Sequence, residues 1–170
     1  MNGFVMAPLH NEEGRHDATG AFHIGAKAFS KLHGLPAPVF FENEGRSSKV
    51  YTAFLKHIEA SAGGWDVFAY FGHGDRTCLP SADIYNRAGA QLLANTIRPK
   101  ATPGLVILLY ACNTGEPGGF ASWLADERAD GGASVYAHGP PPGHTFQNAN
   151  VVMYPGGDWV IQQGSEHWRD

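Results

Sequence analysis

The sequence predicts an α/β protein, a three-layer α/β/α sandwich built on a mostly parallel β-sheet. Two stretches, 66–74 and 105–115, begin as short and nearly continuous apolar runs, the pattern of strands that are buried on both faces of a parallel sheet. Segments with the 3.6-residue period of amphipathic helices alternate with these and other short apolar runs. Because connections between parallel strands are right-handed, such an alternation places helices on both faces of the sheet.

The individual elements follow from local apolar periodicity and from the glycines and prolines that end each run. In chain order we expect a strand at 3–9, a helix at 19–32, a strand at 39–41, a helix from 47 or 48 to about 62, the strand 66–74, a helix at 88–97, the strand 105–115, a helix from 117 to about 129, a strand at 133–137 and a hairpin within 145–162. The polar stretch 75–86 is expected to be a long loop that forms a wall of the substrate site, since it follows the carboxyl end of a strand.

Length and composition indicate one compact domain over residues 1–170. The chain has 43% hydrophobic and 16% charged residues, which argues against an intrinsically disordered protein. A formal net charge of −4 gives no electrostatic reason to expect nucleic acid or an anionic membrane as a partner. No apolar run approaches the roughly 20 residues that cross a bilayer, and no basic-then-apolar signal peptide is visible, so a cytoplasmic protein is expected.

Cysteine and histidine positions predict neither a disulfide framework nor a metal centre. Cys78 and Cys112 are the two cysteines of the chain, and no Cys-x-x-Cys pair occurs. The nine histidines show no His-Glu-x-x-His motif or similar helical pair. The sequence therefore predicts reduced thiols, no metal site and no cofactor.

A histidine and a cysteine follow the apolar parts of the two central strands. Because the carboxyl ends of neighbouring parallel strands border one crevice, His73 and Cys112 are expected to face the same substrate. A thiol needs ionisation to attack, and a nearby imidazole stabilises the thiolate and later protonates the leaving group. The backbone N–H groups of Gly74 and Cys112 are then candidates for the oxyanion hole. The alternatives are a turn-closing His73 and an inert core thiol at Cys112, with Cys78 as a poor second nucleophile.

The two motifs carry a family resemblance. A strand ending in His-Gly is followed, after one helix, by a strand ending in Ala-Cys-x-x-Gly, within the segment Tyr110-Ala111-Cys112-Asn113-Thr114-Gly115. This order resembles the caspase-like cysteine peptidases, the group of caspases, metacaspases, gingipains, separase and CHAT-type domains. The caspase motif is Gln-Ala-Cys-x-Gly, so this chain lacks the glutamine and has one more residue before the glycine.

The resemblance implies a fold, an activity and a class of partner. It implies an α/β/α sandwich with the reactive residues on the third and fourth strands, and cleavage of peptide bonds through a thioester without a cofactor. The substrate is then a protein or peptide. Because such domains often work beside sensor or repeat regions, a regulatory partner in trans is also an open expectation.

The substrate pocket is less defined by the sequence than the reactive pair. In caspases, an arginine after the first strand and the glutamine two places before the cysteine bind an aspartate side chain; Arg15 resembles that arginine in position, whereas Tyr110 replaces the glutamine. Relatives that cut after lysine or arginine line this pocket with carboxylates instead. The segment that begins at His138 follows the strand 133–137 and is expected to lie on the same rim of the site. The carboxylates on suitable loops are Asp17, Asp75 and Asp83. Solvated loop charges are the alternative interpretation of all of these.

Two other functions remain open from the sequence. One is a binding or regulatory module that keeps the peptidase fold without turnover. The other is a different cysteine hydrolase or amidotransferase on a flavodoxin-like sheet. The latter enzymes place the nucleophile in a Gly-x-Cys-x-Gly elbow, and Ala111 and Thr114 break that pattern here.

Overall fold

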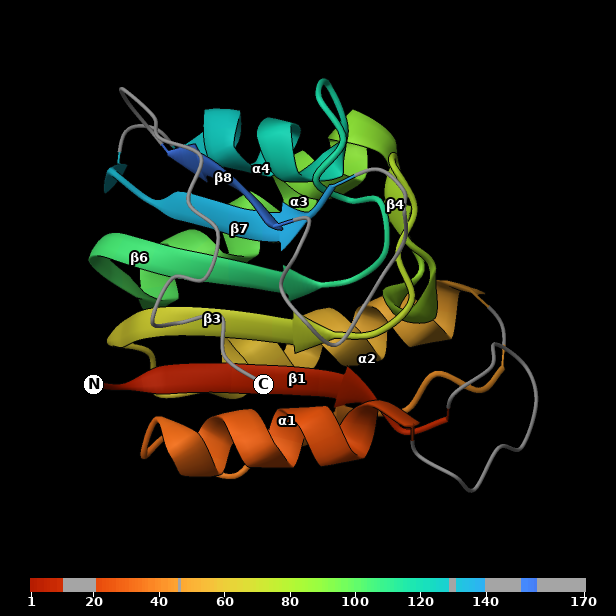
Figure 1. The fold of residues 1–170 in the computed structure, drawn as a ribbon. Coiled ribbons are helices and arrows are strands. Elements are labelled where there is room, and N and C mark those ends of the chain that lie inside the picture. The colour runs from red at the N-terminus through yellow and green to blue at the C-terminus, as the bar shows by residue number, and fades with distance from the viewer. Residues whose placement is uncertain (11–20, 46, 129–130, 140–150, 156–170) are drawn as a thin grey trace.

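Residues 1–10, 21–45, 47–128, 131–139 and 151–155 are described by a computed structural model of the protein. Its centre is a six-stranded sheet in the order β2-β1-β3-β6-β7-β8 (Figure 1). The first five strands of that order are parallel, and β8 is antiparallel to β7. The strands are β1 (Gly3–Pro8), β2 (Val39–Phe41), β3 (Trp65–Phe71), β6 (Ala101–Tyr110), β7 (Ser134–His138) and β8 (Val151–Pro155).

Helices pack on both faces of this sheet. Helix α1 (Ala21–Leu32) covers one face, where its Ala26 and Phe29 join a cluster with side chains of β1, β3, β6 and β7. The opposite face is covered by α2 (Ser47–Ala60), α3 (Asn86–Ile97) and α4 (Phe120–Arg128). The expected α/β class and mostly parallel sheet are therefore confirmed, and helices on both faces fit the expected three layers.

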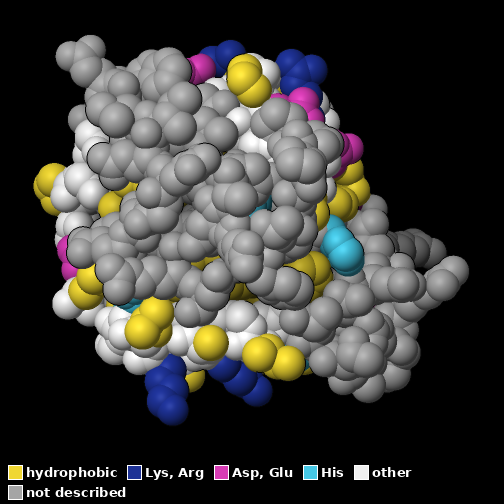
Figure 2. Space-filling view, viewed as in Figure 1, with side chains coloured by type: hydrophobic (Ala, Val, Ile, Leu, Met, Phe, Trp, Pro, Cys, Tyr) yellow, Lys and Arg dark blue, Asp and Glu magenta, His cyan; other side chains and the backbone are white. Residues whose placement is uncertain are grey.

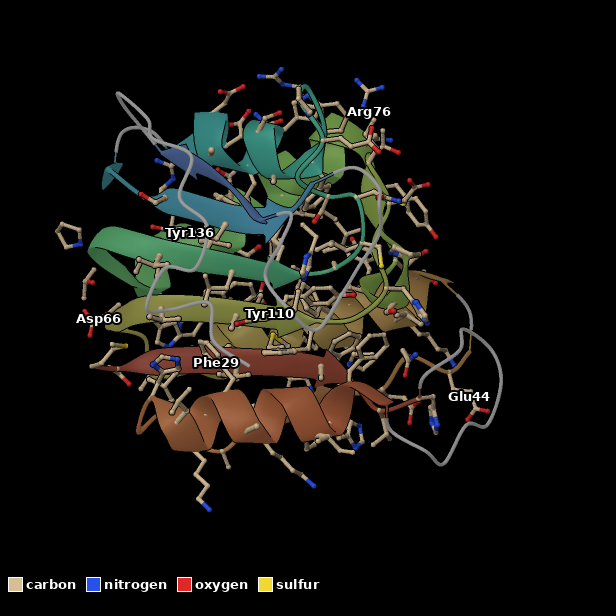
Figure 3. All side chains as sticks on the ribbon, viewed as in Figure 1. Phe29, Glu44, Asp66, Arg76, Tyr110 and Tyr136 are labelled. Atoms are coloured by element: carbon tan, nitrogen blue, oxygen red, sulfur yellow. The ribbon has the colours of Figure 1, made fainter. Side chains whose placement is uncertain are left out.

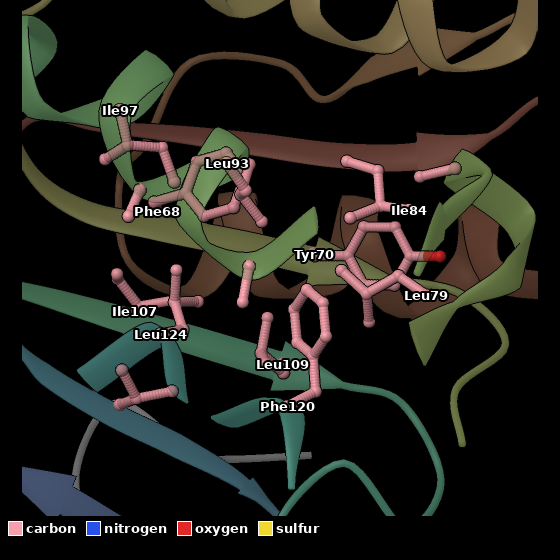
Figure 4. Packing of buried hydrophobic residues seen from close by; sticks show 14 of the residues in the cluster. Phe68, Tyr70, Leu79, Ile84, Leu93, Ile97, Ile107, Leu109, Phe120 and Leu124 are labelled. Carbon is pink, nitrogen blue, oxygen red and sulfur yellow. The ribbon is translucent and has the colours of Figure 1, made fainter. Parts of the chain in front are cut away.

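The larger core cluster lies between the sheet and helices α2 to α4. Tyr70, Phe68 and Leu109 of the central strands are fully buried there, and Figure 4 shows Tyr70 next to Leu79 and Ile84. Each large apolar side chain removed from water in this way contributes roughly 1.5–3 kcal/mol to stability. The burial of residues 67–71 on both faces of β3 explains why this part of the strand is continuously apolar; Asp66 before it is exposed.

The expectation of a long polar loop at 75–86 is wrong. This segment forms a small hairpin of β4 (Cys78–Leu79) and β5 (Ile84–Tyr85), joined by the 3-10 turn η1 (Pro80–Ala82). Cys78, Leu79, Ala82 and Ile84 are buried in it. Its apolar residues are too few and too unevenly spaced to show a period, yet they pack against α3.

Other element boundaries also differ from the expectation. Strands β3 and β6 end at Phe71 and Tyr110, before the expected ends at 74 and 115, so His73 and Cys112 lie just beyond the strands. Helix α4 begins at Phe120 and not at Pro117, because Gly118 adopts the left-handed region at φ 69° and interrupts the turn before it. Strand β6 begins at Ala101, four residues earlier than expected, and 3-10 turn η2 (Arg98–Lys100) precedes it. Of the expected terminal hairpin, β8 is described and pairs with β7; residues 145–150 and 156–162 lie outside the described residues. None of the described helices is long and apolar enough to cross a membrane.

Candidate functional site

The two segments that carry His73 and Cys112 leave the sheet side by side. Strands β3 and β6 are adjacent and parallel, with Phe71 opposite Tyr110. His73 and Cys112 each follow these paired residues by two positions, so both lie at the carboxyl edge of the sheet. The N–H of Gly72 donates to the carbonyl of Tyr110 at 3.2 Å, which continues the pairing beyond the last strand residue.

Gly74 packs directly against the turn that contains Cys112. A Cβ atom at position 74 would lie 2.5 Å from Cβ of Ala111 and 2.8 Å from the carbonyl oxygen of Cys112. It would also lie 2.8 Å from Cγ2 of Thr114. Real Cβ atoms do not approach this closely, so only glycine allows the two segments to meet as they do.

The backbone of His73 is held by two buried side chains. Its N–H donates to Oγ of Ser81 at 3.1 Å, and the hydroxyl of Tyr70 donates to its carbonyl at 3.3 Å. The imidazole is exposed, and its ring lies edge-on to Phe22 of α1 at a centroid distance of 5.0 Å. Ser81 and Tyr70 were missed as supporting residues by the sequence reasoning, since a single buried serine or tyrosine has no distinctive spacing.

The turn after β6 is fixed by local hydrogen bonds and by a tie to β7. Asn113 adopts a left-handed conformation at φ 58°, and the Thr114 hydroxyl donates to the carbonyl of Ala111 at 2.9 Å. The Gly115 N–H donates to the carbonyl of His138 at 2.6 Å. These contacts present Cys112 at the start of a short, tightly bonded turn.

The Cys112 thiol is half-buried, and its environment affects its ionisation. Burial raises the pKa of the Cys112 thiol above its ordinary value, and a hydrogen bond from its own backbone N–H lowers the pKa by less. The neutral thiol is therefore favoured by the surroundings of the sulfur. A stabilising positive charge is needed for the thiolate to form near neutral pH.

Tyr110 and His138, two of the expected pocket residues, lie in the sheet. Tyr110 stacks on Phe71 at 4.2 Å between ring centroids and packs against Phe29 of α1 (Figure 3). His138 is the last residue of β7 and is only 2% exposed, with its ring 6.3 Å from that of Tyr110. The sequence interpretation placed His138 in the loop after the strand; pairing with Val151 of β8 extends β7 to include it.

The structure describes two of the charged candidates for the pocket, Asp75 and Asp83. Asp75 is exposed, and its carboxylate accepts a hydrogen bond from the N–H of Arg76 at 2.6 Å. Asp83 occupies the end of turn η1 with φ 54°. Arg15 and Asp17 lie outside the described residues. The structure thus brings the backbone segment of His73 and Gly74 against the turn that contains Cys112.

In Figure 2, a histidine side chain is exposed on the side to which the strand arrows of Figure 1 point. Basic side chains gather along the upper and lower margins of the same view, away from that histidine.

The comparisons with known proteins add no assignment. No family model matches the chain, and neither a curated protein nor a solved structure matches it.

Proposed function

We propose that this protein is a cysteine endopeptidase of the caspase-like type, with His73 and Cys112 as its catalytic pair. The observation that carries the proposal is the close packing of Gly74 on the Cys112 turn, at the ends of two strands in matching register. Such packing supports a shared site, because proton transfer between the two side chains requires near hydrogen-bond reach.

Side-chain alternation adds support for a common face. Val67, Ala69 and Phe71 of β3 belong to the cluster under α1, and His73 continues this alternation and contacts Phe22 of α1. Leu108 and Tyr110 of β6 belong to the same cluster. Strands β3 and β6 therefore reach their last residues with side chains of the same cluster, and in the proposal the Cys112 thiol turns to the face on which the imidazole of His73 is found.

The proposed reaction proceeds through a thioester. The Cys112 thiolate attacks the carbonyl carbon of the peptide bond, and the N–H groups of Gly74 and Cys112 stabilise the resulting oxyanion. His73 donates a proton to the departing amine as the carbon–nitrogen bond breaks. Water then attacks the thioester carbon, releases the carboxylic acid and returns the thiol. Ser81 and Tyr70 act as positioning residues, since they hold the backbone from which the imidazole projects.

A silent regulatory module is the second candidate, and one observation favours it. Burial raises the pKa of the Cys112 thiol, and an inert thiol in a closed pocket has this property as well. The peptidase proposal differs because it requires His73 to offset the effect of burial. The two candidates therefore separate on the consequences of removing His73.

Cleavage of a mixed peptide library by the full-length protein tests the proposal. We expect Cys112→Ala and His73→Ala each to lower kcat/KM by about 10³-fold or more, as removal of a member of a catalytic unit does. Cys78→Ala is the matched control, because Cys78 is also a thiol outside any disulfide, is buried and is not a member of the proposed pair. An inactive wild-type protein that is folded would favour the module, whereas activity that survives Cys112→Ala would overturn the assignment of Cys112 as the nucleophile.

The same library reports on the first substrate pocket. Preference for an acidic residue before the cleaved bond, lost in Arg15→Ala, would assign Arg15 to the pocket. Preference for lysine or arginine would assign the pocket to carboxylates such as Asp17 and Asp75.

A further inference from the structure

A second group of side chains, one histidine and two glutamates, lies at the carboxyl edge of the sheet, beyond β1 and β2. His10 follows β1, and Glu42 and Glu44 follow β2. One nitrogen of His10 and one oxygen of each glutamate all lie within 4.8 Å of one another. Figure 3 shows Glu44 on the side of the molecule to which the strands point, opposite Asp66.

The distances within this group match those of a coordination site. Nε2 of His10 is 3.2 Å from Oε1 of Glu42 and 3.8 Å from Oε2 of Glu44. Bonds of about 2.0–2.2 Å in a tetrahedral site set the donor atoms about 3.3 Å apart. The His10–Glu42 separation already has this value, and a rotation of the half-exposed Glu44 side chain would shorten the other.

The histidine of this group is built into the fold. His10 is 8% exposed, and Asn43, which is 1% exposed, bonds to its backbone on both sides. The His10 N–H donates to Oδ1 of Asn43 at 2.8 Å, and Nδ2 of Asn43 donates to the His10 carbonyl at 2.9 Å. The N–H of Glu44 donates to Oε1 of Glu42 at 2.9 Å, which orients that carboxylate. The backbone of a buried histidine is thus fixed beside an oriented carboxylate, which limits the positions that these two donor groups can take.

We propose that His10, Glu42 and Glu44 bind a divalent transition-metal ion, with Zn²⁺ as the preferred ion. One imidazole nitrogen with two carboxylate oxygens is a donor set suited to Zn²⁺ and its neighbours, and it is less suited to Ca²⁺ or Mg²⁺, which take oxygen ligands. The ion lies between Nε2 of His10 and the carboxylates of Glu42 and Glu44. Water completes the coordination.

The sequence could not reveal this group through histidine spacing. Its ligands come from two strands that are neighbours in the sheet, with β2 separated from β1 by α1 in the chain. An ion at this place links the carboxyl ends of β1 and β2. It also fixes the residue from which the segment 11–20, with Arg15 and Asp17, continues.

Metal titration of the full-length, tag-free protein tests the proposal. The protein carries Cys112→Ala, so that the thiol cannot supply a ligand, and Co²⁺ serves as the spectroscopic probe and Zn²⁺ as the competitor. We expect one equivalent of Co²⁺ to give d–d absorption that Zn²⁺ removes. Glu42→Gln and Glu44→Gln, which change exposed side chains, should each weaken Zn²⁺ binding by at least about 10-fold.

Further variants separate loss of the proposed ligands from misfolding and from metal binding at other histidines. His10→Ala should abolish binding; since it alters a buried residue, the two glutamine variants decide the outcome if it does not fold. His57→Ala and Glu59→Gln on the exposed face of α2 should leave the affinity unchanged. Absence of Co²⁺ or Zn²⁺ binding, affinity unchanged in both glutamine variants, or tighter binding of Ca²⁺ than of Zn²⁺ would overturn the proposal.

Discussion

The two edges of the parallel sheet differ in how they use polar side chains. At the amino edge, the side chains bond to the backbone of adjoining segments. Asn2 Nδ2 donates to the carbonyls of Gly63 and Gly64, and Thr102 donates to the carbonyl of Trp65. At the carboxyl edge, the backbone is held by Ser81, Tyr70 and Asn43, and the imidazoles of His73 and His10 are left to face other groups.

This difference shows how one sheet separates stability from chemistry. Hydrogen bonds at the amino edge join β1, β3 and β6 where each strand begins. The side chains of Asp66 and Thr102 take part in these bonds. At the carboxyl edge, Ser81, Tyr70 and Asn43 bond to the main chain of His73 and His10. The backbone that carries each imidazole is thereby fixed in place, as the proposed peptidase site and metal site both require.

The largest effect on this comparison is expected from Gly74→Ala. The added Cβ would lie 2.5 Å from Cβ of Ala111 and 2.8 Å from the carbonyl oxygen of Cys112, and both are rigid parts of the Cys112 turn. We expect a loss of about 10²-fold in kcat/KM from displacement of the two segments, together with about 1–3 kcal/mol of stability. Peptide cleavage and urea unfolding measure the two effects.

Gly89→Ala is the control for Gly74→Ala. Its added Cβ would also meet an atom at 2.8 Å, but that atom is a methyl group of Ile84, which can move, and the position lies in helix α3. The helix preference of alanine offsets the crowding by up to about 1 kcal/mol. Activity should be unchanged. Equal activity of Gly74→Ala and wild type would show that the close packing at Gly74 has no catalytic consequence.

A second, smaller effect concerns the reactivity of the two cysteines. Since burial raises the pKa of the Cys112 thiol, more of it is protonated at a given pH than of a free thiol. A positive charge on His73 would reverse this effect, so we expect Cys112 to be alkylated near pH 6 about 10-fold faster than in His73→Ala. In His73→Ala, labelling should rise only above the ordinary thiol pKa of about 8.5.

Mass spectrometry of alkylated peptides measures this difference within one molecule. Cys78, which is 8% exposed, serves as the internal reference for reagent and folding. Its labelling rate should be the same with and without His73. If the pH profile of Cys112 is identical in wild type and His73→Ala, the imidazole does not act on the thiol and the silent module is favoured.

Much of the fold was predictable because its signals are local. The apolar runs of β3 and β6 were identified from consecutive residues, and strands of this kind meet in parallel register, which brings His73 and Cys112 to one edge. Supports such as Ser81 were not predictable, because the buried hairpin that carries Ser81 has no period. The group around His10 was missed for a related reason: its members meet only when β1 and β2 pair.

The smallest effect is expected at the amino edge, from Asp66→Asn. The backbone N–H of Asn2 donates to this carboxylate at 2.8 Å and the Thr102 hydroxyl donates to it at 3.0 Å, and these bonds lower the pKa of Asp66 below 3.8. A lowered pKa stabilises the folded protein at pH values above the ordinary pKa, and this contribution is lost as the pH falls through the folded value. Asp66→Asn should therefore lower the Tm slightly at pH 7, with a difference from wild type that shrinks as the pH falls through the lowered pKa of Asp66. Asp126→Asn, whose carboxylate lies 3.4 Å from Nη2 of Arg87 at an exposed ion pair, should change the Tm less. Neither variant should affect peptide cleavage, since Asp66 lies at the amino edge and Asp126 is exposed on α4. A loss of activity in Asp66→Asn as large as that in Gly74→Ala would show that the two edges are not separate in function.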